Sequence, residues 1–204
     1  MAILVIRHGE TELNAARVLQ PPGAALSVRG VEQARLLARR LADRPLAAIL
    51  ASDLERAHAT ARQLHEVTGA PIELDPELRE RDFGDLRGTP YSEIEVDIFS
   101  DAYRPPGGED GATFHARVDR AWRRIAEIAG RTRGDLAVVT HGLVCRSLAE
   151  HHFALPSGLT LPTRWRNTCL TIVESRPPYR VERIACAAHL GPASLADPVE
   201  SAEA

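Results

Sequence analysis

The chain opens with Ile3-Leu4-Val5-Ile6, an uninterrupted apolar run followed directly by Arg7-His8-Gly9-Glu10-Thr11. Because a short apolar run with β-branched residues is typical of a strand buried on both faces, we expect a strand here. The arginine and the histidine then stand where a buried strand ends and the chain must turn. A fixed cation beside an imidazole on a rigid strand suits a histidine nucleophile that attacks a phosphoryl group. The alternative interpretation is a surface Arg-His pair in an ordinary loop, since short motifs often match by chance.

Apolar strands and amphipathic helices continue to alternate along the chain. Further strands are expected at residues 46–51, 71–74, 136–140, 169–173 and 179–184. Apolar residues recur at helical spacing from Ser27 to Leu41, from Leu54 to about Gly69, from Phe114 to Ile128 and from Gly142 to Phe153, and a short helix is expected around 91–99. Ser52 and Asp53 are both candidates for the N-cap of the second helix, so Ser52 is interpreted as a cap rather than a catalytic group.

This order of elements decides the fold class. Strands that alternate with amphipathic helices predict a mostly parallel sheet covered on both faces. We therefore predict one α/β domain at residues 1–190, folded as a three-layer α/β/α sandwich. The stretch 191–204 is small, acidic and without periodicity, which predicts a disordered C-terminal tail.

The composition favours a soluble cytoplasmic protein. The chain of 204 residues is 44% hydrophobic and 26% charged, and its net charge of −3 argues against broad nucleic-acid binding. No stretch reaches transmembrane length and no signal peptide is evident. The three cysteines are widely spaced and odd in number, which favours reduced thiols. We expect no nucleic-acid or membrane partner. The sequence leaves the oligomeric state open, and a homodimer is one possibility.

Chemically capable side chains follow four of the predicted strands. Arg7 and His8 follow the first strand, Arg56 lies in the first turn of the helix after the second, Glu80 follows the third and His141 the fourth. In an open parallel sheet, ligands bind outside the carboxyl ends of the strands, so these residues are expected at one edge. Backbone N–H groups at helix N-termini there would also favour an anion.

The residue types suit the hydrolysis of a phosphate monoester. Arg7 and Arg56 can each fork onto phosphate oxygens, and a neutral His8 can attack phosphorus in line. His141, if cationic, would stabilise the charge on the equatorial oxygens. Glu80, if kept protonated, could protonate the leaving alkoxide and later accept a proton from water. Because Arg79 and Arg81 would lower the pKa of Glu80, burial must oppose them for this role.

Four segments form an ordered set of motifs: Arg7-His8-Gly9-Glu10-Thr11-Glu12-Leu13-Asn14, Ser52-Asp53-Leu54-Glu55-Arg56-Ala57, Leu78-Arg79-Glu80 with Phe83-Gly84, and Thr140-His141-Gly142. In these segments and in their order the chain resembles a known family, the histidine phosphatase superfamily of phosphoglycerate mutase-like phosphatases. The resemblance runs from about Met1 to Leu190.

The resemblance implies a role for each matching position. His8 corresponds to the nucleophile, Glu80 to the proton donor, and Arg7, Arg56 and His141 to the rest of the phosphate pocket. Three further positions are expected to contact phosphate: Asn14, Thr11 and Gly142. Glu77 and Asp82 are close alternatives to Glu80 as the acid. The family implies no metal and no nucleotide cofactor, and the expected partner is a small phosphorylated substrate.

Two other functions stay open beside the phosphatase. Family mutases carry a Thr-Gly pair shortly after the Asn14 position and an Asn after the His-Gly pair, whereas this chain has 18-Val-Leu-Gln-Pro-Pro-22 and Leu143 there. Both departures weaken the mutase hypothesis. A non-catalytic phosphate binder is the third candidate. Specificity is expected from residues 83–115, where Arg87, Tyr91, Tyr103 and Arg104 could contact the organic part of the substrate.

Overall fold

The sheet at the centre of the molecule follows the predicted parallel arrangement. The structure is a computed structural model that describes residues 1–191, so the predicted tail lies, except for Gly191, outside the described residues. The described strands are β1 (Ala2–Arg7), β2 (Leu46–Ala51), β3 (Ile72–Leu74), β4 (Asp135–Thr140), β5 (Leu170–Glu174) and β6 (Val181–Cys186). Their order is β3-β2-β4-β1-β5-β6. The first four strands in this order are parallel, β5 runs antiparallel to β1, and β6 runs antiparallel to β5.

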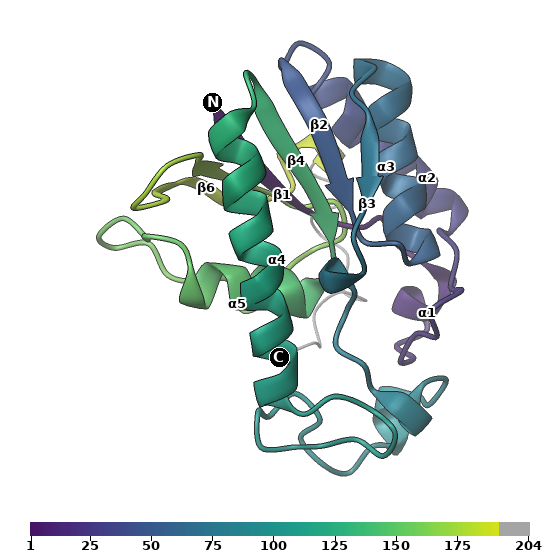
Figure 1. Ribbon diagram of the computed structural model, residues 1–204. Helices are drawn as coiled ribbons and strands as arrows, with labels where there is room; N and C mark the ends of the chain where they lie inside the picture. The colour runs from purple at the N-terminus through teal and green to yellow at the C-terminus, as the bar shows by residue number, and fades with distance from the viewer. Residues whose placement is uncertain (192–204) are drawn as a thin grey trace.

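Helices cover both faces of this sheet (Figure 1). The α-helices are α1 (Glu12–Ala15), α2 (Val28–Arg40), α3 (Glu55–Thr68), α4 (Gly111–Arg131) and α5 (Gly142–His151). Single turns of 3-10 helix lie at Pro76–Leu78, Gly84–Leu86, Tyr91–Glu93 and Ala188–Leu190. None of the helices in residues 1–191 is long and apolar enough to cross a membrane. The three-layer α/β/α fold predicted from the sequence is confirmed.

The first strand is buried from both sides, as its apolar run predicts. Ile3 and Val5 face a core cluster built with α4 and α5, whereas Leu4 and Ile6 face a second cluster built with α2 and α3. Because side chains alternate along a strand, a continuous apolar run is needed to fill both layers. The carboxyl end of β1 is thereby fixed between two packed helical layers.

Two local predictions are wrong. The structure has no helix over the whole of 91–99, only the 3-10 turn Tyr91–Glu93. Apolar residues of this stretch, including Ile98 and Phe99, instead join a small separate cluster with Leu19 and Phe83. Neither Ser52 nor Asp53 caps α3, because the N-cap residue is Leu54, which makes no side-chain capping bond.

Candidate active site

The two predicted histidines lie side by side because of the strand register. β1 and β4 are parallel neighbours, and Arg7 is paired with Thr140 at their ends. The residues that directly follow these two strands are therefore His8 and His141, respectively. Their ring centroids lie 5.1 Å apart at an interplanar angle of 56°. The hydrogen bond from the backbone N–H of His8 to the oxygen of Thr140, at 2.9 Å, holds the two chain ends together.

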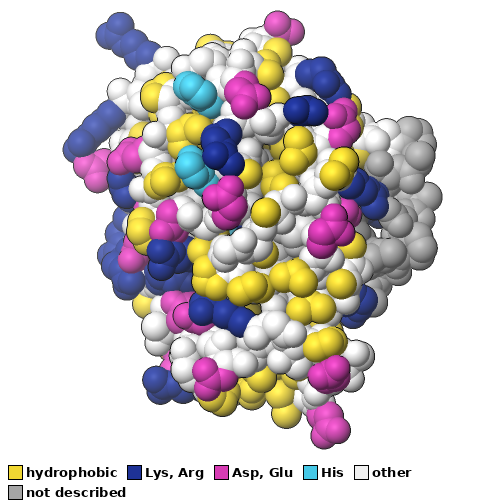
Figure 2. All heavy atoms as spheres, turned by 90° about the vertical axis from the view of Figure 1, so that its right-hand side faces the viewer, with side chains coloured by type: hydrophobic (Ala, Val, Ile, Leu, Met, Phe, Trp, Pro, Cys, Tyr) yellow, Lys and Arg dark blue, Asp and Glu magenta, His cyan; other side chains and the backbone are white. Residues whose placement is uncertain are grey.

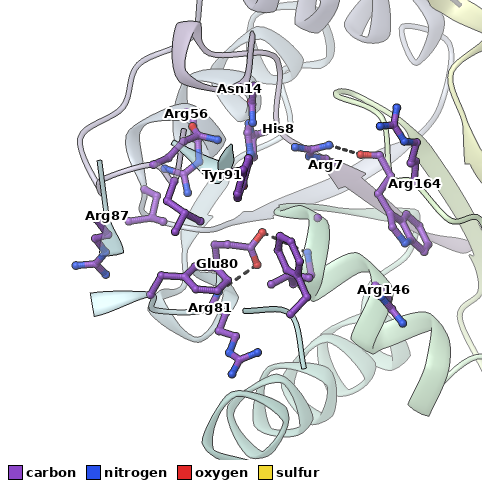
Figure 3. A pocket seen from close by; sticks show the side chains of 18 of the residues that line it. Arg7, His8, Asn14, Arg56, Glu80, Arg81, Arg87, Tyr91, Arg146 and Arg164 are labelled. Atoms are coloured by element: carbon purple, nitrogen blue, oxygen red, sulfur yellow. Dashed lines mark hydrogen bonds between the residues drawn. The ribbon is translucent and has the colours of Figure 1, made fainter. Parts of the chain in front are cut away.

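Most of the other predicted residues meet at the same edge. One pocket is lined by Arg7, His8, Asn14, Arg56, Glu80 and Gly142, together with residues of its outer wall (Figure 3). His141 is fully buried beside His8. Thr11 is placed differently: its side chain caps α1 and donates to Gln20 at 2.8 Å. Thr11 thus supports Asn14 through a capping box instead of lining the pocket.

The environment of His8 favours a neutral ring with a free Nε2. Burial, together with the nearby Arg56 and Arg7 guanidinium groups, holds the pKa of His8 well below its usual value. Its Nδ1 lies 2.7 Å from the backbone oxygen of Gly9, and that oxygen can only accept. Nδ1 therefore carries the proton, which leaves the lone pair on Nε2. This is the tautomer that a nucleophile needs.

The side chain of Glu80 is partly buried, and this burial raises its pKa above the usual value. Two backbone donors oppose that shift, since the N–H groups of Arg81 and Leu143 lie 3.0 and 3.2 Å from the carboxyl oxygens. The neighbouring arginines are engaged elsewhere. Arg79 forms a bidentate ion pair with Asp53, with Nε 2.7 Å from one carboxylate oxygen. Burial therefore outweighs these two donors and the charges of Arg56 and Arg7, so that the pKa of Glu80 lies above its usual value.

The guanidinium of Arg81 donates to four backbone oxygens in the segment 98–109. Its acceptors are the oxygens of Glu109, Ile98, Ser100 and Tyr103. A second arginine, Arg117, donates to the backbone oxygens of Glu77 at 2.7 Å and Arg79 at 2.8 Å and forms an ion pair with Glu109. These two side chains hold the loop that carries Glu80 in place. The residue types did not indicate this role, because most of the acceptors are main-chain oxygens.

His141 differs from the cationic group that the sequence suggested. Burial, and next to it the charge of Arg56, holds the pKa of His141 well below its usual value. The ring is hydrogen-bonded through Nε2 to the Ser52 hydroxyl at 2.9 Å. Its Nδ1 is buried and has no hydrogen-bond partner among the described residues. A neutral ring with its proton on Nδ1 would still offer one donor to a phosphate oxygen.

Arg56 and Arg7 supply the positive charge of the pocket. Burial lowers the pKa of Arg56 to about 10, so its guanidinium stays charged at neutral pH. The Nε of Arg56 is buried without a hydrogen-bond partner within residues 1–191, and one terminal nitrogen lies 3.4 Å from the oxygen of Pro21. Arg7 is oriented by a hydrogen bond to the backbone oxygen of Trp165 (Figure 3). A buried cation with an unused donor is suited to an anionic ligand.

The outer wall of the pocket comes partly from the predicted specificity segment. Arg87 and Tyr91 line the pocket, as do Phe83 and Phe99. Tyr103 instead packs in the small apolar cluster of this segment, and the Arg104 guanidinium lies 3.8 Å from Asp110. Of the four residues expected to contact the substrate, Arg87 and Tyr91 thus line the pocket, and Tyr103 and Arg104 do not.

Fold and site together define an α/β protein whose pocket is lined by His8, Arg7, Arg56 and Glu80, with His141 buried beside His8. The chain belongs to the histidine phosphatase superfamily, branch 1, whose family model matches residues 3–183. This confirms the family expected from the sequence motifs.

The relatives include proteins named as mutases and as phosphatases. The chain is 35% identical over 162 residues to phosphoglycerate mutase-like protein 4 of Arabidopsis thaliana, covering 72% of this chain and 69% of that protein. The structure of Bacillus stearothermophilus YhfR is 29% identical, with a TM-score of 0.79 and coverage of 93% and 98%. A mycobacterial glucosyl-3-phosphoglycerate phosphatase in complex with VO3 is 26% identical, with a TM-score of 0.73 and coverage of 85% and 90%.

Proposed function

We propose that this protein hydrolyses phosphate monoesters of small molecules through a phosphohistidine intermediate on His8. The observation that supports this most is the pairing of a buried His8 whose pKa is lowered with a partly buried Glu80 whose pKa is raised, in a pocket that also holds Arg7 and Arg56. The lowered pKa of His8 favours the neutral ring that a nucleophile needs, and the raised pKa of Glu80 favours the protonated form that a proton donor needs.

In the first step, Nε2 of His8 attacks phosphorus while the bond to the ester oxygen breaks. Glu80 gives its proton to the leaving alkoxide, so that an alcohol departs. Arg7 and Arg56 stabilise the phosphoryl oxygens, and His141 is the neutral donor beside them. In the second step, water attacks phosphorus, the ionised Glu80 accepts its proton, and the bond from phosphorus to nitrogen breaks. Inorganic phosphate leaves and the starting state is restored.

Trapping the intermediate tests this proposal. Rapid quench of the full chain with radiolabelled aryl phosphate should yield an alkali-stable, acid-labile phosphoryl group on His8. His8→Ala should abolish both the label and turnover. His58→Ala is the matched control, because His58 lies on α3 outside the pocket lining, and it should behave as the parent protein. Unchanged turnover in His8→Ala would overturn the mechanism.

Two specific alternatives are measured in the same preparation. Relatives named as phosphoglycerate mutases make the mutase the first alternative, although Gln20, Pro22 and Leu143, which depart from the mutase pattern, line the pocket. Interconversion of phosphoglycerates that depends on added bisphosphoglycerate would favour it. Phosphate binding without any label on His8 would favour a non-catalytic binder.

A further inference from the structure

The segment after Trp165 holds the backbone of the proposed nucleophile. Asn167 is buried and donates from Nδ2 to the main-chain oxygen of His8 at 3.0 Å. The N–H of Thr168 donates to the same oxygen at 3.2 Å and to that of Arg7 at 3.1 Å. Thr168 has a φ of 55°, a left-handed conformation that is costly for a β-branched residue. Such an outlier beside the backbone of His8 suggests a function for the turn that contains it.

The same Asn167 amide also contacts the side chain of Asn14. Its Nδ2 lies 3.3 Å from Oδ1 of Asn14, and the backbone N–H of Thr11 lies 3.3 Å from that same oxygen. An amide oxygen that accepts from two N–H donors cannot be exchanged with the amide nitrogen without losing both bonds. Because Asn14 also lines the pocket, its Nδ2 is the end left to donate to a ligand there.

We propose that Asn167 is a positioning residue, which fixes the amide of Asn14 so that Nδ2 faces the phosphate site. This inference rests on the proposed function for its ligand, a phosphate group. Asn14 then adds a neutral N–H donor to the charged donors of Arg7 and Arg56, at no cost of reorientation when the ligand binds.

The Asn167→Asp variant tests the orientation directly. A carboxylate at this position would face two oxygens, those of His8 and Asn14, and Asn14 can relieve the repulsion by turning its amide. The pocket would then present Oδ1 to phosphate. The dissociation constant of inorganic phosphate, measured by calorimetry on the full chain, should rise about tenfold. Asn14→Asp, which also presents an oxygen to the pocket, should give a similar loss.

Alanine variants keep the test decisive if the aspartate variant does not fold. When Asn167 acts through Asn14, phosphate affinity in Asn14→Ala should be nearly insensitive to the further change Asn167→Ala. Thr171→Ala is the matched control, since Thr171 is buried on β5 and accepts from Ala185 N–H at 3.0 Å. It should lower the melting temperature and leave phosphate binding unchanged.

The outcomes separate this inference from the proposed function. Additive losses in the Asn14→Ala, Asn167→Ala cycle, or unchanged phosphate affinity in a folded Asn167→Asp, would overturn the positioning role. The parent protein could bind phosphate and show non-additive losses in this cycle, yet form no phosphohistidine. That result would support the positioning role of Asn167 and refute the proposed reaction. A parent protein that binds no phosphate would overturn both.

Discussion

The hydroxyl of Ser52 lies 2.9 Å from Nε2 of His141, so a residue that resembles a helix cap in the sequence instead contacts the buried imidazole. The same Oγ accepts from the backbone N–H of Leu54 at 3.3 Å. Its O–H is therefore available to donate to Nε2, which would place the ring proton on Nδ1. A neutral His141 can then act as a donor to phosphate, which reconciles its lowered pKa with a role in the pocket.

Ser52→Ala should lower kcat about tenfold through loss of this tautomer control. The measurement is steady-state hydrolysis of an aryl phosphate. In the His141→Asn background the further change Ser52→Ala should have little effect, because the ring it orients is gone. Ser27→Ala is the control: Ser27 is a buried serine that caps α2, so its loss should lower stability but not kcat. Equal effects of Ser52→Ala in both backgrounds would refute the role.

Glu80→Gln should lower kcat by about 10²-fold or more for alkyl phosphates, because an alkoxide is a poor leaving group without a proton donor. The loss should be smaller for 4-nitrophenyl phosphate. In the parent protein, activity should fall as pH rises through the raised pKa of Glu80, and the variant should lose this limb of the profile.

Glu77→Gln is the matched control for the acid. Glu77 was a close alternative in the sequence, but its carboxylate lies 2.8 Å from Nε of Arg120 outside the pocket lining. We expect kcat and its pH profile to stay unchanged. A profile that moves with Glu77 and not with Glu80 would reassign the proton donor.

Stability should fall as pH drops below about 6.5, the usual pKa of histidine in an unfolded chain. The lowered pKa values of His8 and His141 mean that the unfolded state binds protons that the folded state does not. Each histidine therefore adds a slope of about 1.4 kcal/mol per pH unit below that point. Urea unfolding between pH 5 and 7 should show a shallower slope for His141→Asn, and a slope unchanged by that variant would contradict a neutral buried ring.

The strand framework could be predicted because its signal is local. The run Ile3-Leu4-Val5-Ile6 packs into both core layers, and a strand that does so needs apolar side chains at consecutive positions, which the sequence shows directly. The convergence of Arg7, His8, Arg56 and Glu80 followed from parallel topology, since each follows a strand that ends at the same edge.

What could not be predicted depends on contacts between distant positions. Ser52 meets His141 across 89 residues, and Asn167 meets His8 across 159. The charge state of His141 depends on burial, which the residue type alone does not reveal. The stretch 91–99 was wrongly predicted as a helix because its apolar residues pack with Leu19 in a separate cluster.

Gly30→Ala should be among the most damaging single substitutions in the chain. A Cβ at Gly30 would lie 1.9 Å from the backbone oxygen of Glu10, and one at Gly9 would lie 2.5 Å from the Gly30 oxygen. The start of α2 thus packs directly on the loop that follows His8. Relief requires moving that loop, at a cost of about 3 kcal/mol. We expect a lower melting temperature together with reduced turnover, because the displaced backbone carries the proposed nucleophile.

Gly130→Ala on α4 is the control for this prediction. A Cβ at Gly130 would meet nothing within 4 Å, so the variant should raise stability by about 0.5–1 kcal/mol and leave turnover unchanged. A Gly30→Ala protein with parental melting and turnover would show that the loop after His8 can shift freely.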